Sequence, residues 1–303
     1  METSVLPIDS PEKEETPFRH FINEFAESKL ALIGLAMLLL VLTIAILAPF
    51  ISPQNPYDLG QIDLMDSKLA PGEKSTAGKA YLLGTDDQGR DMLSAIFYGL
   101  RISLGVGVAS TVVAVVIGLT FGLMAAYFGG WVDTLIMRVV DIQLSFPAIL
   151  LALILLAVFG QGADKVIIAL ITVQWAYYAR TVRASALVEK QKEYVEAARV
   201  LSLSKTRILF KHLLPNCLPP LIVVATVQVA HAISLEATLS FLGLGLPITE
   251  PSLGLLISNG FTYLMSGKYW ISFYPGLALL LTIMSINLVA DQLRDVLNPR
   301  LKK

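Results

Sequence analysis

The sequence predicts an all-α, polytopic membrane protein with six transmembrane helices. Hydrophobic residues make up 55% of its 303 residues and charged residues only 16%, whereas soluble proteins average about 45–50% and about 25%. The charges also cluster, and they leave uncharged runs long enough for membrane helices, which need about 20 apolar residues. These runs are Leu30–Tyr57, Ile102–Val132, Ile142–Ala163, His212–Leu235 and Tyr269–Ala290.

The chain begins with a polar segment, residues 1–28, whose acidic run Glu12–Glu15 predicts a tail without a core of its own. An amphipathic piece at Phe18–Phe25 is expected to lie at the membrane surface. A regulatory tail is the alternative. The first span is predicted at Lys29–Phe50, and because no A-x-A cleavage site follows it, we expect an uncleaved helix.

Residues 52–99 are predicted to form a long loop, whose most distinctive stretch is Leu83–Asp91, LGTDDQGRD. We expect a turn at Gly84, then a helix capped by Thr85 or Asp86 that runs toward Tyr98. The oxygen-bearing residues do not alternate as in a calcium-binding EF-hand loop, so Asp–Arg pairing is their expected role. The residues of this predicted structural turn are Gly84, Asp86, Arg90 and Asp91.

The second span is predicted at Arg101–Phe128. Within it, Gly118 and Gly122 have the spacing that allows close helix approach. The third span, Trp131–Phe159, follows a Gly-Gly turn and begins with charged residues near an interface.

The fourth span, Val166–Val188, has a short uncharged stretch, so Arg180 and Arg183 are expected to snorkel to the interface. The fifth and sixth spans are predicted at Pro219–Ser240 and Ile271–Leu293. Between them, residues 241–268 form a loop whose apolar piece is too short to span and is interpreted as re-entrant or interfacial.

Six spans place both termini on one side of the membrane. That side, which also holds residues 189–216, carries 16 of the 23 lysines and arginines. Since positive residues favour the cytoplasmic side, both termini and residues 189–216 are predicted to be cytoplasmic, and the loops 52–99 and 241–268 external. The chain thus divides into a tail, 1–28, and a transmembrane domain, 29–303.

Residues 189–216 form a charged helical segment that a soluble partner could reach. Lys192, Glu196 and Arg199 lie at helical pairing distance, each pair being worth a few tenths of a kcal/mol. Tyr194, Ala197 and Leu201 form a narrow apolar strip suited to a shallow groove, and Ala197 with Ala198 keeps the surface low. Ser204 is expected to cap a second short helix, Lys205–Leu213. A solvated connector without a partner is the alternative.

Polar residues inside the predicted spans are candidates for a translocation pathway. His231 and Glu236 lie in the fifth span and Asn287 in the sixth. A carboxylate is costly in lipid and usually faces the interior of a helix bundle. As a hypothesis, Glu236 lines the pathway and attracts the ammonium group of a peptide. The alternative is a Glu236 at the interface that is hydrogen-bonded to a neighbouring loop.

Nearly the whole chain resembles the C-type permease subunits of bacterial dipeptide and oligopeptide ABC importers, a family that also includes nickel-uptake subunits. The matching stretches are Leu83–Asp91, Tyr127–Asp133, Met137–Asp141, the Glu196-Ala197-Ala198 region with Leu214-Pro215, Phe241–Gly245 and Leu293–Asp295. The resemblance implies the fold of a type I ABC importer permease. The matching stretches are specific for the family but not for the substrate that is transported.

The Glu-Ala-Ala region resembles the EAA motif, which implies a cytoplasmic coupling helix that docks on an ATPase subunit. The coupling residues that it implies are Tyr194, Glu196, Ala197, Ala198, Arg199, Leu201 and Ser202. Two positions depart from the motif: Ser202 replaces its usual glycine and His212 its usual isoleucine. A serine can form the same turn, with strain if its φ is positive.

The resemblance implies a complex with a second, similar permease, two cytoplasmic ATPase subunits that bind ATP and Mg²⁺, and an external substrate-binding protein in the bacterial inner membrane. The chain has no Gly-x-x-x-x-Gly-Lys-Ser/Thr motif, so we predict no ATPase activity, no catalytic residue, and no cofactor or metal bound by this chain. The single cysteine, Cys217, excludes an intrachain disulfide framework.

Two other functions are consistent with the spans. A stand-alone secondary transporter would use Glu236 and His231 as a proton relay, but the sequence shows no repeat of broken helices. A membrane scaffold without transport activity would leave the polar residues in the spans unexplained. Within the ABC importer family, the sequence leaves open whether the cargo is a dipeptide, a longer peptide or nickel.

Overall fold

The computed structural model describes residues 17–58, 60–75 and 78–297, and confirms the all-α class. The predicted tail lies mostly outside the described residues, and only its last part is seen, as helix α1. The principal helices are α1 (Pro17–Glu27), α2 (Lys29–Ile51), α3 (Met92–Phe128), α4 (Gly130–Ser145), α5 (Ala148–Phe159), α6 (Ala163–Glu189), α7 (Glu193–Val200), α8 (Lys205–Arg207), α9 (Leu214–Phe241), α10 (Leu253–Phe261) and α11 (Trp270–Leu297). Short 3₁₀ turns, η1 and η3, occupy Leu64–Asp66 and Leu264–Ser266, and a π-helical stretch, η2, occupies Ile208–Leu213.

Six helical segments correspond to the six predicted spans. Among the described residues, α2, α3, α9 with its preceding turns, and α11 are long and apolar enough to cross a membrane. Helix α6 is 27 residues long but less apolar, because it contains Arg180 and Arg183. The third predicted span corresponds to the bent pair α4 and α5, which has the length and hydropathy of a span only when the two helices are taken together.

The third span is not the continuous helix predicted from the sequence. Helices α4 and α5 meet at an angle of 91°. Pro147 lacks a backbone N–H and disfavours helical geometry in the residue before it. Phe146 accordingly has extended backbone angles, φ −91° and ψ 142°. The prolyl residue therefore breaks this span.

The second span and the helix predicted to run toward Tyr98 form one continuous helix, α3. Helix α3 starts at Met92, and its N-cap is Asp91, whose carboxylate accepts from Ser94 N, rather than Thr85 or Asp86. The long loop therefore ends at Asp91 and not at Gly99. With 37 residues, α3 is about 55 Å long, which exceeds the roughly 30 Å hydrocarbon layer, so α3 extends beyond it.

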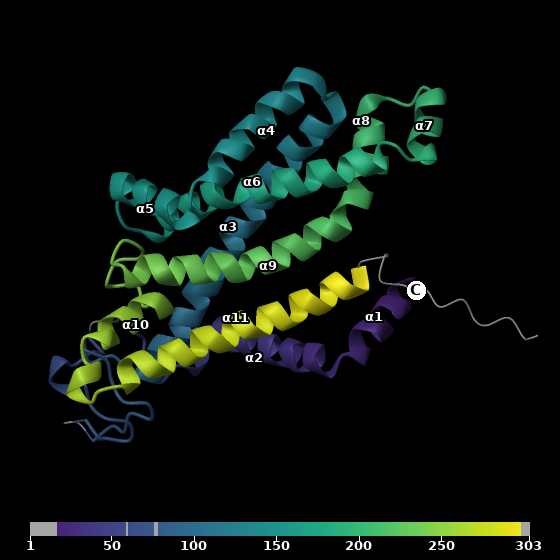
Figure 1. Ribbon diagram of the computed structural model, residues 1–303. Helices are drawn as coiled ribbons and strands as arrows, with labels where there is room; N and C mark the ends of the chain where they lie inside the picture. The colour runs from purple at the N-terminus through teal and green to yellow at the C-terminus, as the bar shows by residue number, and fades with distance from the viewer. Residues whose placement is uncertain (1–16, 59, 76–77, 298–303) are drawn as a thin grey trace, which may run out of the picture.

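The loop 52–91 and α10 lie at one end of the bundle, called here the loop end (Figure 1). Helices α1, α7 and α8 and the end of α11 lie at the opposite end, called here the α7 end. Helix α1 is held there by a hydrogen bond from Gln292 Nε2 to Glu24 O of 3.1 Å. This arrangement of the described chain ends fits an even number of spans.

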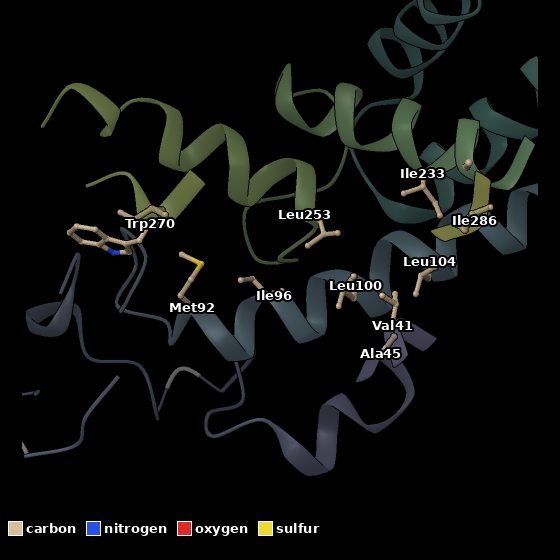
Figure 2. Close-up of a cluster of buried hydrophobic side chains, with 12 residues drawn as sticks. Val41, Ala45, Met92, Ile96, Leu100, Leu104, Ile233, Leu253, Trp270 and Ile286 are labelled. Carbon is tan, nitrogen blue, oxygen red and sulfur yellow. The ribbon is translucent and has the colours of Figure 1, made fainter. Parts of the chain in front are cut away.

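A cluster of buried side chains joins α2, α3, α9, α10 and α11 near the loop end (Figure 2). Helix α3 contributes the central row of this cluster, Met92, Ile96, Leu100 and Leu104. On its other side, α3 meets α6 at the predicted glycine pair. A Cβ atom at Gly118 or Gly122 would lie 2.6 Å from the carbonyl oxygen of Trp175 or Ala179. The predicted close helix approach is therefore present.

The Asp86–Arg90 pair predicted for the loop is present and buried. Asp86 Oδ2 accepts from Arg90 Nε at 2.6 Å, and Asp86 Oδ1 accepts from the backbone N–H groups of Gln88 and Arg90 at 2.9 Å. The two side chains are 0% and 1% exposed. Gly84, with φ 78°, has no room for a side chain, since a Cβ would lie 2.5 Å from Leu69 O. These contacts give the loop a fixed fold.

The turn is also attached to the membrane helices. Trp270 Nε1, at the start of α11, donates to Thr85 O at 3.2 Å. Gln54 Oε1 accepts from Asp91 N at 2.5 Å, and Ser94 Oγ accepts from Gln54 N at 3.0 Å. The loop 52–91 is thus bonded to the starts of α3 and α11.

Replacing Asp86 by asparagine is expected to destabilise the fold by about 3–5 kcal/mol, because it leaves the buried Arg90 guanidinium without its carboxylate. Asp164→Asn is the matched control, since the Asp164 side chain is 74% exposed and lies 3.9 Å from Lys165, an arrangement worth at most about 1 kcal/mol. Thermal unfolding of both purified variants in one detergent measures the difference. Equal melting temperatures would contradict a structural role for the buried pair.

Candidate functional site

Residues 189–216 fold into a small helical hairpin that projects at the α7 end from the junction of α6 and α9 (Figure 1). The hairpin has a core of its own, in which Val195 and Ala198 of α7 pack against Ile208 and Leu213. The second predicted helix, Lys205–Leu213, is present as α8 followed by η2, with Ser204 as its N-cap.

The structure divides the predicted coupling residues into an exposed and an inward group. Glu196, Ala197, Arg199, Leu201 and Ser202 are exposed. Ala198 is 3% exposed and belongs to the core of the hairpin, so it does not form part of a low outer surface. Tyr194 is half-buried, so the predicted strip of Tyr194, Ala197 and Leu201 is not a single outer face.

The ion pairs of the hairpin also differ from those expected. Lys192 pairs with Glu189 at 2.7 Å and not with Glu196. Lys192 is the N-cap residue of α7, so it lies at the point where the chain leaves α6. The Glu196 carboxylate remains on the exposed surface of the hairpin, available to a partner.

Tyr194 links the hairpin to both neighbouring helices. Its hydroxyl donates to Glu189 Oε2 at 2.6 Å and accepts from Asn216 Nδ2 at 3.1 Å. Burial, together with the hydrogen bond to the Glu189 carboxylate, raises the pKa of Tyr194 to about 12. The hydroxyl therefore stays protonated near neutral pH and can donate to Glu189. Lys190 Nζ donates to the carbonyl oxygens of Ala126 and Tyr127 at 2.9 and 3.0 Å, which attaches the end of α3 as well.

Helix α7 ends in a Schellman motif with a serine at the position that favours glycine. Ser202 N–H donates to Arg199 O at 2.9 Å and Leu203 N–H to Ala198 O at 3.2 Å. Ser202 has a φ of 54°, so the strain expected for a serine in this turn is present. Helix α9 ends in the same motif, but there the residue is Gly243, with φ 77°.

A polar hollow of about 240 Å³ lies between α5, α6 and α9. It contains the predicted pathway residue His231. Its other polar lining residues are Gln174, Tyr177, Gln228, Ser234 and Thr238. Sequence reasoning missed these five, although polar residues at helical spacing within the apolar α9 were a usable signal.

A second, larger hollow of about 630 Å³ opens at the α7 end between α6, α9 and α11. The helix period places most of the lining residues of both hollows on one face of each helix. On α6 these are Gln174, Tyr177, Ser185 and Val188, and on α9 they are Asn216, Pro220, Val224, His231, Ser234 and Thr238. We call this set of lining residues the α6–α9 face.

The other two predicted pathway residues lie elsewhere. Glu236 is 0% exposed, and its carboxylate accepts from Ser103 Oγ of α3 and Ser240 Oγ of α9, each at 2.8 Å. It is not among the residues that line the two hollows. Asn287 lines a separate, mainly apolar hollow on α11 with Leu280 and Met284. The structure thus does not bring His231, Glu236 and Asn287 together.

The arginines of α6 have partners that the sequence analysis did not foresee. Arg183 NH2 donates to Asp133 Oδ2 at 2.6 Å, and Arg180 NH2 donates to Asp141 Oδ1 at 2.6 Å. Both acids belong to α4. Instead of only snorkelling to the interface, Arg180 and Arg183 attach the broken span to α6. The described residues contain no group of three or more His, Cys, Asp or Glu residues that could hold a metal ion.

Comparison with known proteins identifies similar chains. Residues 118–303 match the family model of binding-protein-dependent transport system inner membrane components, and residues 16–71 match the N-terminal transmembrane domain of oligopeptide transport permease C. The chain is 44% identical to the dipeptide transport system permease protein DppC of Escherichia coli, over 95% of each chain. It is 38% identical to the di/tripeptide transport system permease protein DppC of Pseudomonas aeruginosa, over 95% of this chain and 93% of the relative.

Among solved structures, the chain is similar to one from the inward-facing MetNI methionine ABC transporter. The TM-score is 0.55 and the identity 24%, over 68% of this chain and 97% of that one. This likeness supports the fold of an ABC importer permease for the membrane helices.

Ser202→Gly is expected to stabilise the protein by about 0.5–1 kcal/mol, because glycine relieves the left-handed strain at the end of α7. Gly243→Ser is the reciprocal variant and is expected to destabilise by a similar amount, since a Cβ at Gly243 would meet no atom within 4 Å and only the backbone cost remains. Thermal unfolding of the two purified variants tests both signs. Two shifts of the same sign would contradict the strain assigned to Ser202.

Proposed function

This chain belongs to the family of binding-protein-dependent transport system inner membrane components, and we propose that it is the permease subunit through which an ATP-driven importer moves di- and oligopeptides into the cell. As a member of this family it is a membrane transport permease and not a catalytic enzyme. The observation that carries the proposal is the α7 hairpin, an exposed helical element that is bonded to three membrane helices.

The hairpin is suited to couple ATP hydrolysis to movement of the membrane helices. Glu196, Ala197, Arg199, Leu201 and Ser202 form its exposed surface, where a groove of an ATPase subunit can receive a short helix. Tyr194 and Lys190 attach the hairpin to the ends of α3, α6 and α9. A displacement of the hairpin would therefore move these three helix ends together.

The α6–α9 face is the proposed translocation surface. It carries amide, hydroxyl and imidazole groups and lines both the hollow between α5, α6 and α9 and the larger hollow at the α7 end. These groups both donate and accept hydrogen bonds, so they can bind the N–H and C=O groups of a peptide backbone, which are the same for every side-chain sequence. In this proposal His231 lines the pathway. Glu236 instead joins α9 to α3 through Ser103 and is held within α9 by Ser240.

The proposed complex contains a second, similar permease, two ATPase subunits that bind ATP and Mg²⁺, and an external substrate-binding protein. The α7 end, with α1 and the end of α11, faces the cytoplasm in this proposal, and both termini are proposed to be cytoplasmic, since that side carries most of the lysines and arginines. The loop 52–91 and α10 then face outward, where a binding protein would deliver its cargo. Relatives named for dipeptide and di/tripeptide transport support a peptide cargo. Nickel is the alternative cargo.

Glu196→Lys is expected to abolish the binding of the ATPase subunits, because it reverses the charge on the exposed surface of the hairpin. Affinity purification of the tagged chain at native expression, in mild detergent, measures the subunits that accompany it. Asp164→Lys is the matched control, since Asp164 is equally charged and exposed but lies at the loop end. If the Glu196→Lys chain retains its ATPase subunits, the coupling proposal is wrong. It is also wrong if the chain purifies alone and still takes up substrate into proteoliposomes driven by an ion gradient.

Ser234→Phe is expected to reduce peptide uptake about tenfold or more, because an aromatic ring would project into the hollow of about 240 Å³ and narrow it. ATP hydrolysis stimulated by the binding protein should persist, since the hairpin is unchanged. Ile222→Phe is the control, because Ile222 is exposed on α9 but lines neither hollow. Uptake of labelled dipeptide into proteoliposomes, compared with uptake of radioactive nickel, tests both the pathway and the cargo.

Glu236→Gln separates the two roles considered for this carboxyl group. We expect normal uptake per folded molecule and a lower melting temperature, because Glu236 bonds to serines and lines neither hollow. Loss of uptake without a change in melting temperature would instead indicate that Glu236 lines the translocation pathway.

A further inference from the structure

A groove of about 310 Å³ runs between α2 and α3 near the loop end. Its walls are apolar and include Leu42, Ile46 and Val108. Its floor is open at Gly105, where a Cβ atom would meet nothing within 4 Å. One charged side chain, that of Arg101, lies in the lining.

Arg101 has no counter-ion in the described part of the chain. Its side chain is exposed, and it forms no ion pair or hydrogen bond there. Glu250 is the nearby acid: burial and the charge of Glu250 raise the pKa of the Tyr57 phenol, whereas the charge of Arg101 lowers it. No ion pair joins Glu250 to Arg101 within the described ranges. A guanidinium group beside apolar walls is costly unless an anion compensates its charge.

Aromatic side chains indicate the depth of Arg101 in the membrane. Tyr57 is 46% exposed at the loop end, and its ring packs edge-on, at 5.5 Å, against that of Tyr98, which lies one helical turn before Arg101. Tyrosine is enriched at the level of the lipid headgroups. Helix α2 ends at Ile51, a short distance beyond Ile46. Arg101 therefore lies at the headgroup level, and the groove extends from it into the hydrocarbon layer.

We propose that this groove binds one phospholipid from the leaflet at the loop end, with the lipid phosphate on Arg101 and an acyl chain along Gly105 and Val108. The chemistry at both ends fits this ligand. A phosphate supplies the anion that Arg101 lacks, in the geometry that a guanidinium group binds well. The surrounding surface of α2 is apolar and exposed at Leu39, Leu40 and Ile46, as expected for a surface in contact with lipid.

A protein helix is a weaker candidate for the occupant. It would have to present an acidic side chain within the membrane, opposite Arg101, whereas every phospholipid carries its phosphate at this depth. The groove is also separate from the α6–α9 face, since it lies between α2 and α3. Lipid binding here is therefore independent of the proposed transport function.

Native mass spectrometry of the delipidated protein, purified with its accompanying subunits, tests the proposal. The probe is palmitoyl-oleoyl-phosphatidylglycerol, and the matched ligand without phosphate is palmitoyl-oleoyl-glycerol. We expect wild-type protein to bind one phosphatidylglycerol at least about tenfold more tightly than it binds the diacylglycerol, because charge-assisted hydrogen bonds to Arg101 are lost without the phosphate.

Two pairs of variants locate the site. Arg101→Gln should lose the tight phosphatidylglycerol and Arg101→Lys should weaken it, whereas Gly105→Phe should exclude the acyl chain and Gly105→Ala should bind as the wild type does. Unfolding temperatures without lipid establish that each variant folds. Unchanged phosphatidylglycerol binding by Arg101→Gln would overturn the proposal. Loss of the second permease from Arg101→Gln would also overturn it, because the groove would then be a protein interface.

Discussion

The close contact between α3 and α6 is the constraint on which the rest of the structure depends. At Gly118 and Gly122 the backbone of α3 lies so near to α6 that a Cβ atom would approach a carbonyl oxygen to 2.6 Å. Helix α3 also contacts α2, α4, α9, α10 and α11, so its position determines theirs. Lys190, just beyond α6, bonds back to the carbonyl groups at the end of α3. The two helices are thus joined both along their length and at the α7 end, which makes them a rigid support for the hairpin.

The sequence predicted the parts of the fold for which one local sequence pattern is sufficient. Long uncharged runs located the spans, and the spacing of Gly118 and Gly122 predicted a close helix contact that is present. The break at Phe146 was missed, because an apolar run that contains one proline also occurs in kinked but continuous spans. The continuity of α3 was missed for another reason. The charge of Arg101 suggested a membrane boundary, whereas the helix itself begins at Met92 and extends beyond the hydrocarbon layer.

The candidate site was predicted in outline but not in detail. Helical spacing located the hairpin and its exposed Glu196, but it did not show that Ala198 packs inside, because both faces of a short helix carry apolar residues. Glu236 was a candidate pathway residue, beside an interfacial role, because a carboxyl group inside a span usually has a function. Of its two partners, Ser240 lies four residues further along α9, at a spacing that allows the contact. Ser103 belongs to α3, and nothing in the sequence indicates that it converges with Glu236. The α6–α9 face depends on the pairing of two helices, which no single stretch of sequence specifies.

The ion pairs between α4 and α6 have a consequence for how the chain enters the membrane during synthesis. An arginine at the centre of an inserting helix costs about 2.5–3.5 kcal/mol, so α6, with Arg180 and Arg183, is poorly suited to leave the translocon alone. Asp133 and Asp141 on α4 are synthesised earlier and neutralise these charges in the folded protein. If the same pairing occurs at the translocon, α4 remains there until α6 has emerged and the helices enter the lipid as one unit. In that case the order of the residues in the chain, with the acids before the arginines, also assists membrane insertion.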